Sequence, residues 1–142
     1  MEKGSSKTVR ASAALAGSGA FDAAPTPIAL SPNTRHVTLY VTFARGSSTS
    51  AFALRVKESL DGVTWYYQTA ADGGAAAASA PWLRVPFSLL EYRSAVPASG
   101  SDVTWAIPLE VTGGKYVAFE FGEYGDTANP GTLAAVAVEG AG

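Results

Sequence analysis

Hydrophobic and polar residues alternate along most of the chain, which is the pattern of half-buried β-strands. The clearest run, residues 36–43, places four apolar side chains on one face: Val37, Leu39, Val41 and Phe43. The same alternation predicts further strands over residues 8–15, 51–57, 63–69, 82–87, 103–111, 116–121 and 132–138. No segment shows the apolar period of an amphipathic helix, so the pattern predicts an all-β protein.

Turn-forming residues separate these runs. Asp61-Gly62 and Gly113-Gly114 are short enough to close two-residue hairpins. At the first of them we expect the Asp61 side chain to cap the turn and Gly62 to take a positive φ. Seven to nine short strands with turns between them predict a β-sandwich, a jelly roll or a barrel.

Two prolines, Pro86 and Pro108, lie inside strand-like runs. Proline has no N–H to donate to a neighbouring strand, so each is expected on an edge strand or at a bulge. Edge strands are also where another chain can add to a sheet. The prolines therefore mark candidate contact edges.

Aromatic side chains are the candidate binding residues. In residues 63–69, Trp65 and Tyr67 fall on one face and Tyr66 on the other. One face is expected in the core, and an exposed ring on the other could stack on a sugar or anchor a protein interface. Tyr66, Trp82 and Tyr92 are the predicted surface anchors.

The first 27 residues are rich in Ala, Gly and Ser and poor in bulky apolar side chains. They predict an extended, flexible arm, followed by a single sandwich domain over residues 28–142; a first strand plus a long loop is the alternative. Lys3, Lys7 and Arg10 give the arm a basic character that would suit an acidic surface on a neighbouring subunit.

Composition narrows the possible functions. The 142-residue chain has no cysteine, one histidine (His36) and a formal charge of −2. Disulfides, thiolate metal sites and nucleic-acid binding are therefore not expected. The sequence has no catalytic motif, no apolar run of the roughly 20 residues that cross a bilayer and no signal-peptide core. We expect a non-enzyme without metal or cofactor, made in the cytoplasm and not bound to a membrane.

Several segments together resemble a known class of proteins. They are Arg35 to Phe43, Ser59 to Trp65, Gly114 to Phe121 and Gly131 to Val138. In this order they resemble small β-sandwich virion proteins of tailed phages, including the jelly-roll decoration (cement) proteins of capsids. The resemblance implies an antiparallel, jelly-roll-like β-sandwich, with the last two segments forming a C-terminal hairpin.

This resemblance also implies a function. A decoration protein binds the outside of the capsid and stabilises the shell by bridging major capsid subunits. The expected partners are then the major capsid protein and further copies of the chain, with a homotrimer favoured over a homodimer. Two alternatives stay open: a carbohydrate- or receptor-binding module, and another head-fibre, neck or tail protein of the virion.

Overall fold

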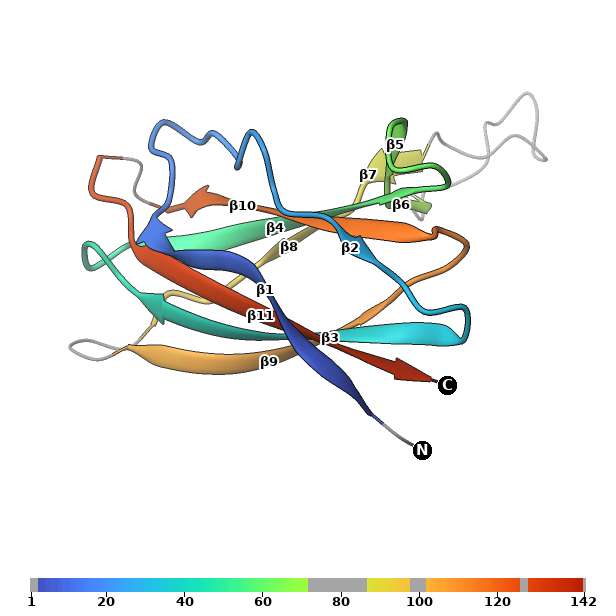
Figure 1. The fold of residues 1–142 in the computed structure, drawn as a ribbon. Coiled ribbons are helices and arrows are strands. Elements are labelled where there is room, and N and C mark those ends of the chain that lie inside the picture. Colours follow the sequence, from blue (N-terminus) through green and yellow to red (C-terminus); the bar gives the residue numbers. More distant parts are fainter. Residues whose placement is uncertain (1–2, 72–86, 98–101, 126–127, 142) are drawn as a thin grey trace, which may run out of the picture.

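The structure, a computed structural model, describes residues 3–71, 87–97, 102–125 and 128–141. These residues form strands and connecting loops, and no helix among them is long and apolar enough to cross a membrane. The strands in chain order are β1 (Lys3–Ala14), β2 (Ile28–Ala29), β3 (Thr34–Ala44), β4 (Ala51–Ser59), β5 (Trp65–Tyr67), β6 (Thr69–Ala71), β7 (Phe87–Leu89), β8 (Glu91–Arg93), β9 (Val103–Glu110), β10 (Tyr116–Tyr124) and β11 (Thr132–Ala141) (Figure 1).

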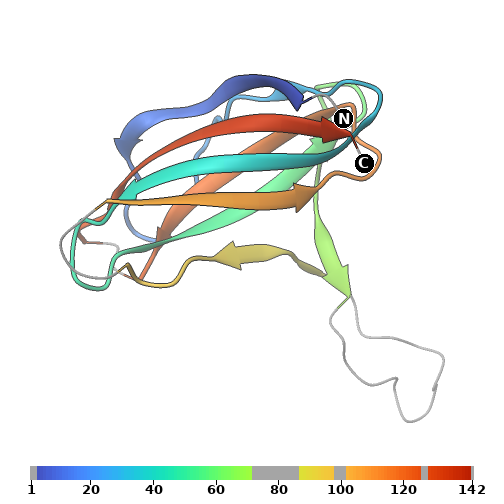
Figure 2. The same cartoon turned by 90° about the horizontal axis from the view of Figure 1, so that it is seen from below.

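The strands form two antiparallel sheets that pack face to face (Figure 2). One sheet has the order β1-β11-β3-β9; the other has the order β2-β10-β4-β5, with β8 also paired to β4. The chain passes from one sheet to the other between β1 and β2, β2 and β3, β3 and β4, β8 and β9, β9 and β10, and β10 and β11. This order is that of a jelly roll, so the predicted fold class is confirmed. A separate two-stranded ribbon, β6–β7, extends from one end.

Side chains from both sheets fill the space between them. The predicted inward face of β3 is fully buried, with Val37, Leu39 and Phe43 at 0% exposure. Phe52 of the opposite sheet packs against Phe43 with ring centroids 5.3 Å apart in an edge-to-face arrangement. Such aromatic pairs add stability beyond the area they bury.

Two expected hairpins are corrected by the sheet order. β10 and β11 belong to different sheets, so they do not form the C-terminal hairpin that the resemblance implies. Gly113-Gly114 likewise lies in a loop that joins β9 to β10 across the sandwich. Sequence alternation is the same for a hairpin and for a crossing between sheets, because each strand buries one face in either case.

The Asp61-Gly62 turn is longer than predicted but is built as expected. It lies within residues 60–64, between β4 and β5, whose first register pair is Ser59 with Trp65. The Asp61 carboxylate accepts hydrogen bonds from the amides of Val63 (2.8 Å) and Thr64 (2.9 Å), and Gly62 has a φ of 81°. Hydrogen bonds from Thr64 and Val63 lower the pKa of Asp61 below its ordinary value.

The N-terminal residues form a sheet strand in place of the free arm expected for residues 1–27. β1 pairs with β11 from Lys3 to Ala14, with three register shifts along its length. The following loop runs beside β10, where Phe21 forms a bridge with Gly122. The structure thus adopts the alternative of a first strand plus a long loop. Small side chains suffice for β1 because Val9 is the only hydrophobic side chain that its described residues bury in the core.

The edge position predicted for Pro108 is confirmed. It lies in β9, which is the outermost strand of its sheet and pairs only with β3 among the described strands. Pro86 lies outside the described residues.

The aromatic strand differs from the expectation. Only residues 65–67 pair with β4, and Val63 is 81% exposed in the preceding turn. Neither face of this segment enters the core, since Tyr66 is 61% and Tyr67 is 42% exposed. β5 is the outermost strand of its sheet and pairs only with β4 among the described strands, so its side chains are incompletely covered.

Candidate binding surfaces

The outer side of the β1-β11-β3-β9 sheet carries no charged side chain over three consecutive cross-strand rows. We call this surface the neutral face. The register aligns Thr38 and Tyr40 of β3 with Val138 and Val136 of β11. The members of the neutral face are Ser6, Thr8, Thr38, Tyr40, Thr42, Thr104, Ala106, Pro108, Ala134, Val136 and Val138. In the next row the Glu110 carboxylate lies opposite His36.

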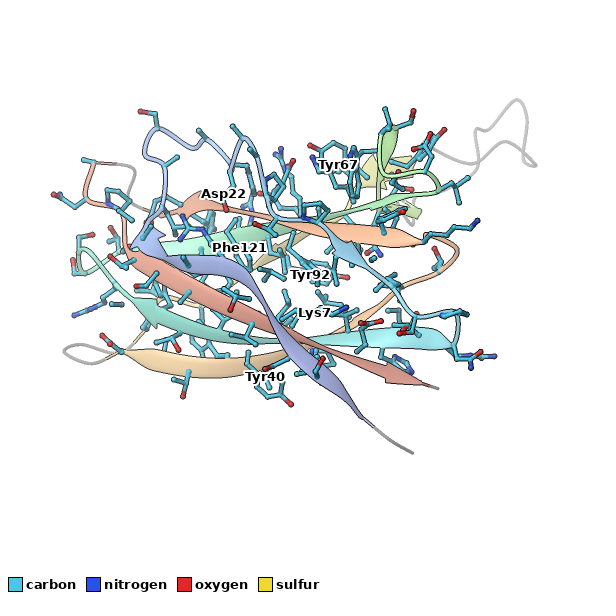
Figure 3. All side chains as sticks on the ribbon, viewed as in Figure 1. Lys7, Asp22, Tyr40, Tyr67, Tyr92 and Phe121 are labelled. Atoms are coloured by element: carbon cyan, nitrogen blue, oxygen red, sulfur yellow. The ribbon has the colours of Figure 1, made fainter. Side chains whose placement is uncertain are left out.

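Tyr40 is the largest side chain of the neutral face and lies at its middle. It is 48% exposed, with Val136 on one side and Ala106 on the other. Its ring projects outward, on the opposite side of the molecule from Tyr67 (Figure 3). Depletion of charge and enrichment of tyrosine are typical of the centre of a protein–protein interface.

The sandwich is open along the edge next to the neutral face. Four hydrophobic side chains on β8 and β9 pack against the core but are only partly buried: Tyr92, Val103, Trp105 and Ile107. An apolar groove of about 430 Å³ runs between these two strands, with Phe52 and Leu54 among its lining. The backbone of β9 has no strand on its outer side among the described residues. This edge therefore adds apolar surface to the neutral face.

The outer side of the other sheet has the opposite character. Lys57 and Glu120 form an ion pair of 3.0 Å, and the Tyr67 hydroxyl donates to the same carboxylate at 2.9 Å. Burial and this carboxylate raise the pKa of Tyr67 above its ordinary value. The Arg55 guanidinium lies 3.8 Å from the centroid of the Phe21 ring. The charges on this side are thus already paired or covered within the chain.

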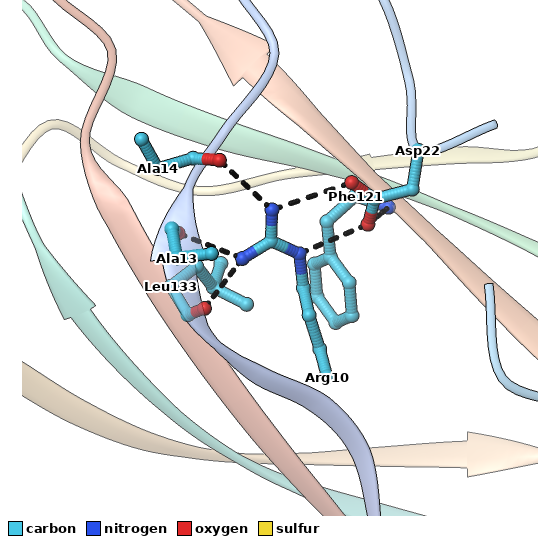
Figure 4. Close-up of polar contacts among 6 residues, drawn as sticks. All are labelled: Arg10, Ala13, Ala14, Asp22, Phe121 and Leu133. Atoms are coloured by element: carbon cyan, nitrogen blue, oxygen red, sulfur yellow. Dashed lines mark hydrogen bonds and ion pairs between the residues drawn. The ribbon is translucent and has the colours of Figure 1, made fainter. Parts of the chain in front are cut away.

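Arg10, expected as a surface cation, lies between the two sheets at one end of the sandwich (Figure 4). Its Nε and one terminal nitrogen donate to both carboxylate oxygens of Asp22, at 3.0 and 3.3 Å. The other N–H groups donate to the carbonyls of Ala13 (2.8 Å), Leu133 (2.5 Å) and Ala14 (3.2 Å). Asp22 in turn accepts the Phe121 amide of the opposite sheet at 3.2 Å. Every donor of Arg10 is therefore used inside the chain.

Lys7, the second expected surface cation, is also paired internally. Its ammonium contacts a Glu139 carboxylate oxygen at 2.9 Å, and the other oxygen accepts hydrogen bonds from the Ser31 amide (2.8 Å) and the Thr34 hydroxyl (2.7 Å). Burial acts to raise the pKa of Glu139, but these three donors outweigh it and hold the pKa below its ordinary value. The side chain of Lys3 lies outside the described part, so the structure supplies no free basic arm.

The lowered pKa of Glu139 predicts a pH-dependent stability. Its stabilising contribution is complete above the unfolded pKa, about 4.3, and is lost as the pH falls through the lower folded pKa. At pH 7 we expect Glu139→Gln to cost about 1–3 kcal/mol of unfolding free energy in urea titrations. The gap between wild type and variant should be smaller at pH 3 than at pH 7. An equal gap at pH 7 and pH 3 would contradict this role.

Two of the three aromatic anchors predicted from sequence lie in the described part of the structure. Tyr66 and Tyr92 line a common groove at the end of the sandwich. Trp82 lies outside the described residues. The most central exposed ring, Tyr40, was not predicted as an anchor. The sequence did contain a signal for this exposure, because alternation places Tyr40 on the other face of the strand from the buried Leu39 and Val41.

Buried carboxylates in this chain hold loops. Glu58 accepts from Gly114, Glu123 from Gly131 and Glu139 from Ser31, in each case from a backbone amide. Within the described residues, no cluster of three or more His, Cys, Asp or Glu side chains could hold a metal ion. His36 is exposed at the start of β3.

Comparison of the chain with protein-family models, with curated proteins and with solved structures finds no match in any of the three.

Proposed function

We propose that this protein is a virion structural protein that binds the outside of a phage capsid and stabilises the shell by bridging major capsid subunits. The observation that carries the proposal is the neutral face, an uncharged sheet surface centred on Tyr40. The jelly-roll fold and the resemblance of the strand sequences to those of decoration proteins support it. The occupant of the neutral face is the major capsid protein.

The chemistry of the neutral face suits a protein partner. Its threonine, alanine and valine side chains are short, so little conformational entropy is lost when they are covered. The absence of charge removes the cost of burying an unpaired ion. A folded protein surface can therefore cover the face with only apolar and neutral polar contacts.

The size of the neutral face argues for several weak contacts in place of one strong contact. Four strands at 4.8 Å spacing and rows spanning about five residues give an area on the order of 300–400 Å². A stable one-to-one complex buries about 800 Å² on each partner. The β9 edge adds to the contact, and an oligomer would present several copies at once. Multivalent binding of this kind raises the overall affinity without new contacts.

Replacing Tyr40 with glutamate tests the proposal. The probe is an empty, expanded shell assembled from the major capsid protein encoded beside the gene for this chain. Wild-type protein should sediment with the shells. Tyr40→Glu should bind at least about 100-fold more weakly, because the change removes a central ring and buries a charge.

Tyr66→Glu is the matched control, since it places the same charge at another exposed tyrosine and should leave shell binding unchanged. Circular dichroism should show that both variants fold, because both side chains are exposed. Equal binding by Tyr40→Glu and wild type would reject the neutral face as the contact. A chain without a neighbouring capsid gene, or wild-type protein that stays in the supernatant, would reject the capsid as the partner.

A further inference from the structure

A second surface lies beside β5 at one end of the sandwich, and it shares Pro108 with the neutral face. It is a groove of about 760 Å³, within the usual range for small-molecule sites. We call it the tyrosine groove. Its lining includes Tyr66, Tyr67 and Tyr92. Tyr66 is 61% exposed, whereas the Tyr67 hydroxyl is bonded to Glu120 on the outer side of the sheet. The loop between β9 and β10 forms part of its lining through Thr112 and Gly114.

The charge of the tyrosine groove limits its ligands. Glu58 and Glu110 line it, and none of its lining residues is a lysine, an arginine or a histidine. The Glu58 carboxylate is engaged within the chain, because it accepts hydrogen bonds from Gln68 (2.7 Å) and Gly114 (2.9 Å). A phosphate, a sulfate or a carboxylate entering the groove would meet like charge and find no cation to pair with.

Neutral hydrogen-bonding groups remain available beside the rings. The Gln68 amide nitrogen donates to Glu58 and to the Glu110 carbonyl, which leaves its amide oxygen as an acceptor. In the described part of the chain, no group bonds to the hydroxyls of Tyr66 or Tyr92. Burial, followed by the Glu110 charge, raises the pKa of Tyr92, so its hydroxyl stays protonated at neutral pH.

The loop that lines the groove is held in place before any ligand binds. Glu58 also accepts the Thr112 amide (3.3 Å) and hydroxyl (3.2 Å). A Cβ on Gly114 would come within 2.7 Å of the Glu58 Cβ, so this close approach requires glycine. A groove whose lining is fixed in the free protein loses little entropy on binding.

We propose that the tyrosine groove binds a neutral saccharide. The apolar faces of a pyranose ring can pack on the Tyr66 and Tyr92 rings, and its hydroxyls can bond to the free tyrosine hydroxyls and to the Gln68 oxygen. The absence of cations selects against sialylated, uronic and phosphorylated glycans. Tyr66, the ring on which the saccharide site depends most, is not part of the neutral face, so either proposal can fail without the other.

Isothermal titration calorimetry of the full chain tests the proposal. The probes are neutral trisaccharides of glucose, mannose, galactose and N-acetylglucosamine, with sialyllactose as the anionic comparison. At least one neutral trisaccharide should bind with a Kd between roughly 10 μM and 1 mM. Tyr66→Ala should weaken that binding at least about tenfold, since one stacking surface is lost.

Tyr40→Ala is the matched control: it removes an exposed tyrosine on the neutral face and should leave the Kd unchanged. Gln68→Glu provides a second variant, which should weaken binding because its carboxylate repels Glu58 and reshapes the groove. No heat with any neutral trisaccharide at 10 mM, stronger binding of sialyllactose, or equal affinities of wild type and Tyr66→Ala would each overturn the proposal.

Discussion

Arg10→Met is expected to lower the free energy of unfolding by about 3–4 kcal/mol. Methionine keeps much of the length of the side chain but none of its five N–H donors. The Asp22 carboxylate, only 20% exposed, would be left without its counter-ion, and three backbone carbonyls would lose their donor. Because the Arg10–Asp22 pair connects β1 to the segment beside β10, its loss should also loosen the N-terminal strand. Urea unfolding followed by tryptophan fluorescence measures the change.

Arg35→Met is the control for Arg10→Met. Arg35 is exposed at the start of β3, and its guanidinium makes no contact within the described residues. Surface substitutions of this kind change stability by no more than about 0.5 kcal/mol. A similar small change for Arg10→Met would mean that Arg10 does not hold the sheets together. Amide hydrogen exchange should then also show β1 as protected in the variant as in wild type.

Glu58→Ala should cost about 2–4 kcal/mol of unfolding free energy and should also disorder the tyrosine groove. The carboxylate is 8% exposed and is the common acceptor for Gln68, Thr112 and Gly114. Removing it deprives all three residues of this acceptor and frees the loop between β9 and β10, although Gln68 keeps its bond to the Glu110 carbonyl. Chemical denaturation gives the stability, and NMR line widths of the loop amides report its mobility.

Two other variants separate the contribution of the Glu58 charge from that of its shape. Glu58→Gln keeps one acceptor oxygen but turns an N–H₂ group toward the surrounding donors, so its cost should be about half that of alanine. Glu110→Ala removes an exposed carboxylate at the same groove and should cost less than about 0.5 kcal/mol. If Glu58→Ala were as mild as Glu110→Ala, the loop would have to be held by other contacts.

Strand positions in this protein follow from sequence, whereas the pairing of strands does not. The alternation around Val37 to Phe43 identifies β3, because burial of one face forces period two. The same signal cannot distinguish a hairpin partner from a strand of the opposite sheet, so it could not correct the pairing of β10 with β11 that the resemblance implied. β2 is only two residues long, too short for any periodic pattern.

The candidate binding surfaces were predictable only in part. Proline at position 108 marked the open edge, since a missing N–H is tolerated there. Prediction of the neutral face would have required the strand register, because no single strand shows that the uncharged rows continue across four strands. The prediction that Lys7 and Arg10 are free surface cations was wrong for a related reason. Their partners, Glu139 and Asp22, are brought close only by the fold, so the sequence does not show the ion pairs.

Hydroxyl-radical footprinting of the protein on capsid shells tests the central claim most directly. The reagent oxidises exposed tyrosines, so Tyr40 and Tyr124, which are 48% and 39% exposed, serve as probe and reference on opposite sides of one molecule. If the neutral face contacts the shell, oxidation of Tyr40 should fall several-fold on binding while that of Tyr124 is unchanged. Bound protein in which Tyr40 is oxidised as fast as in the free protein would contradict the account.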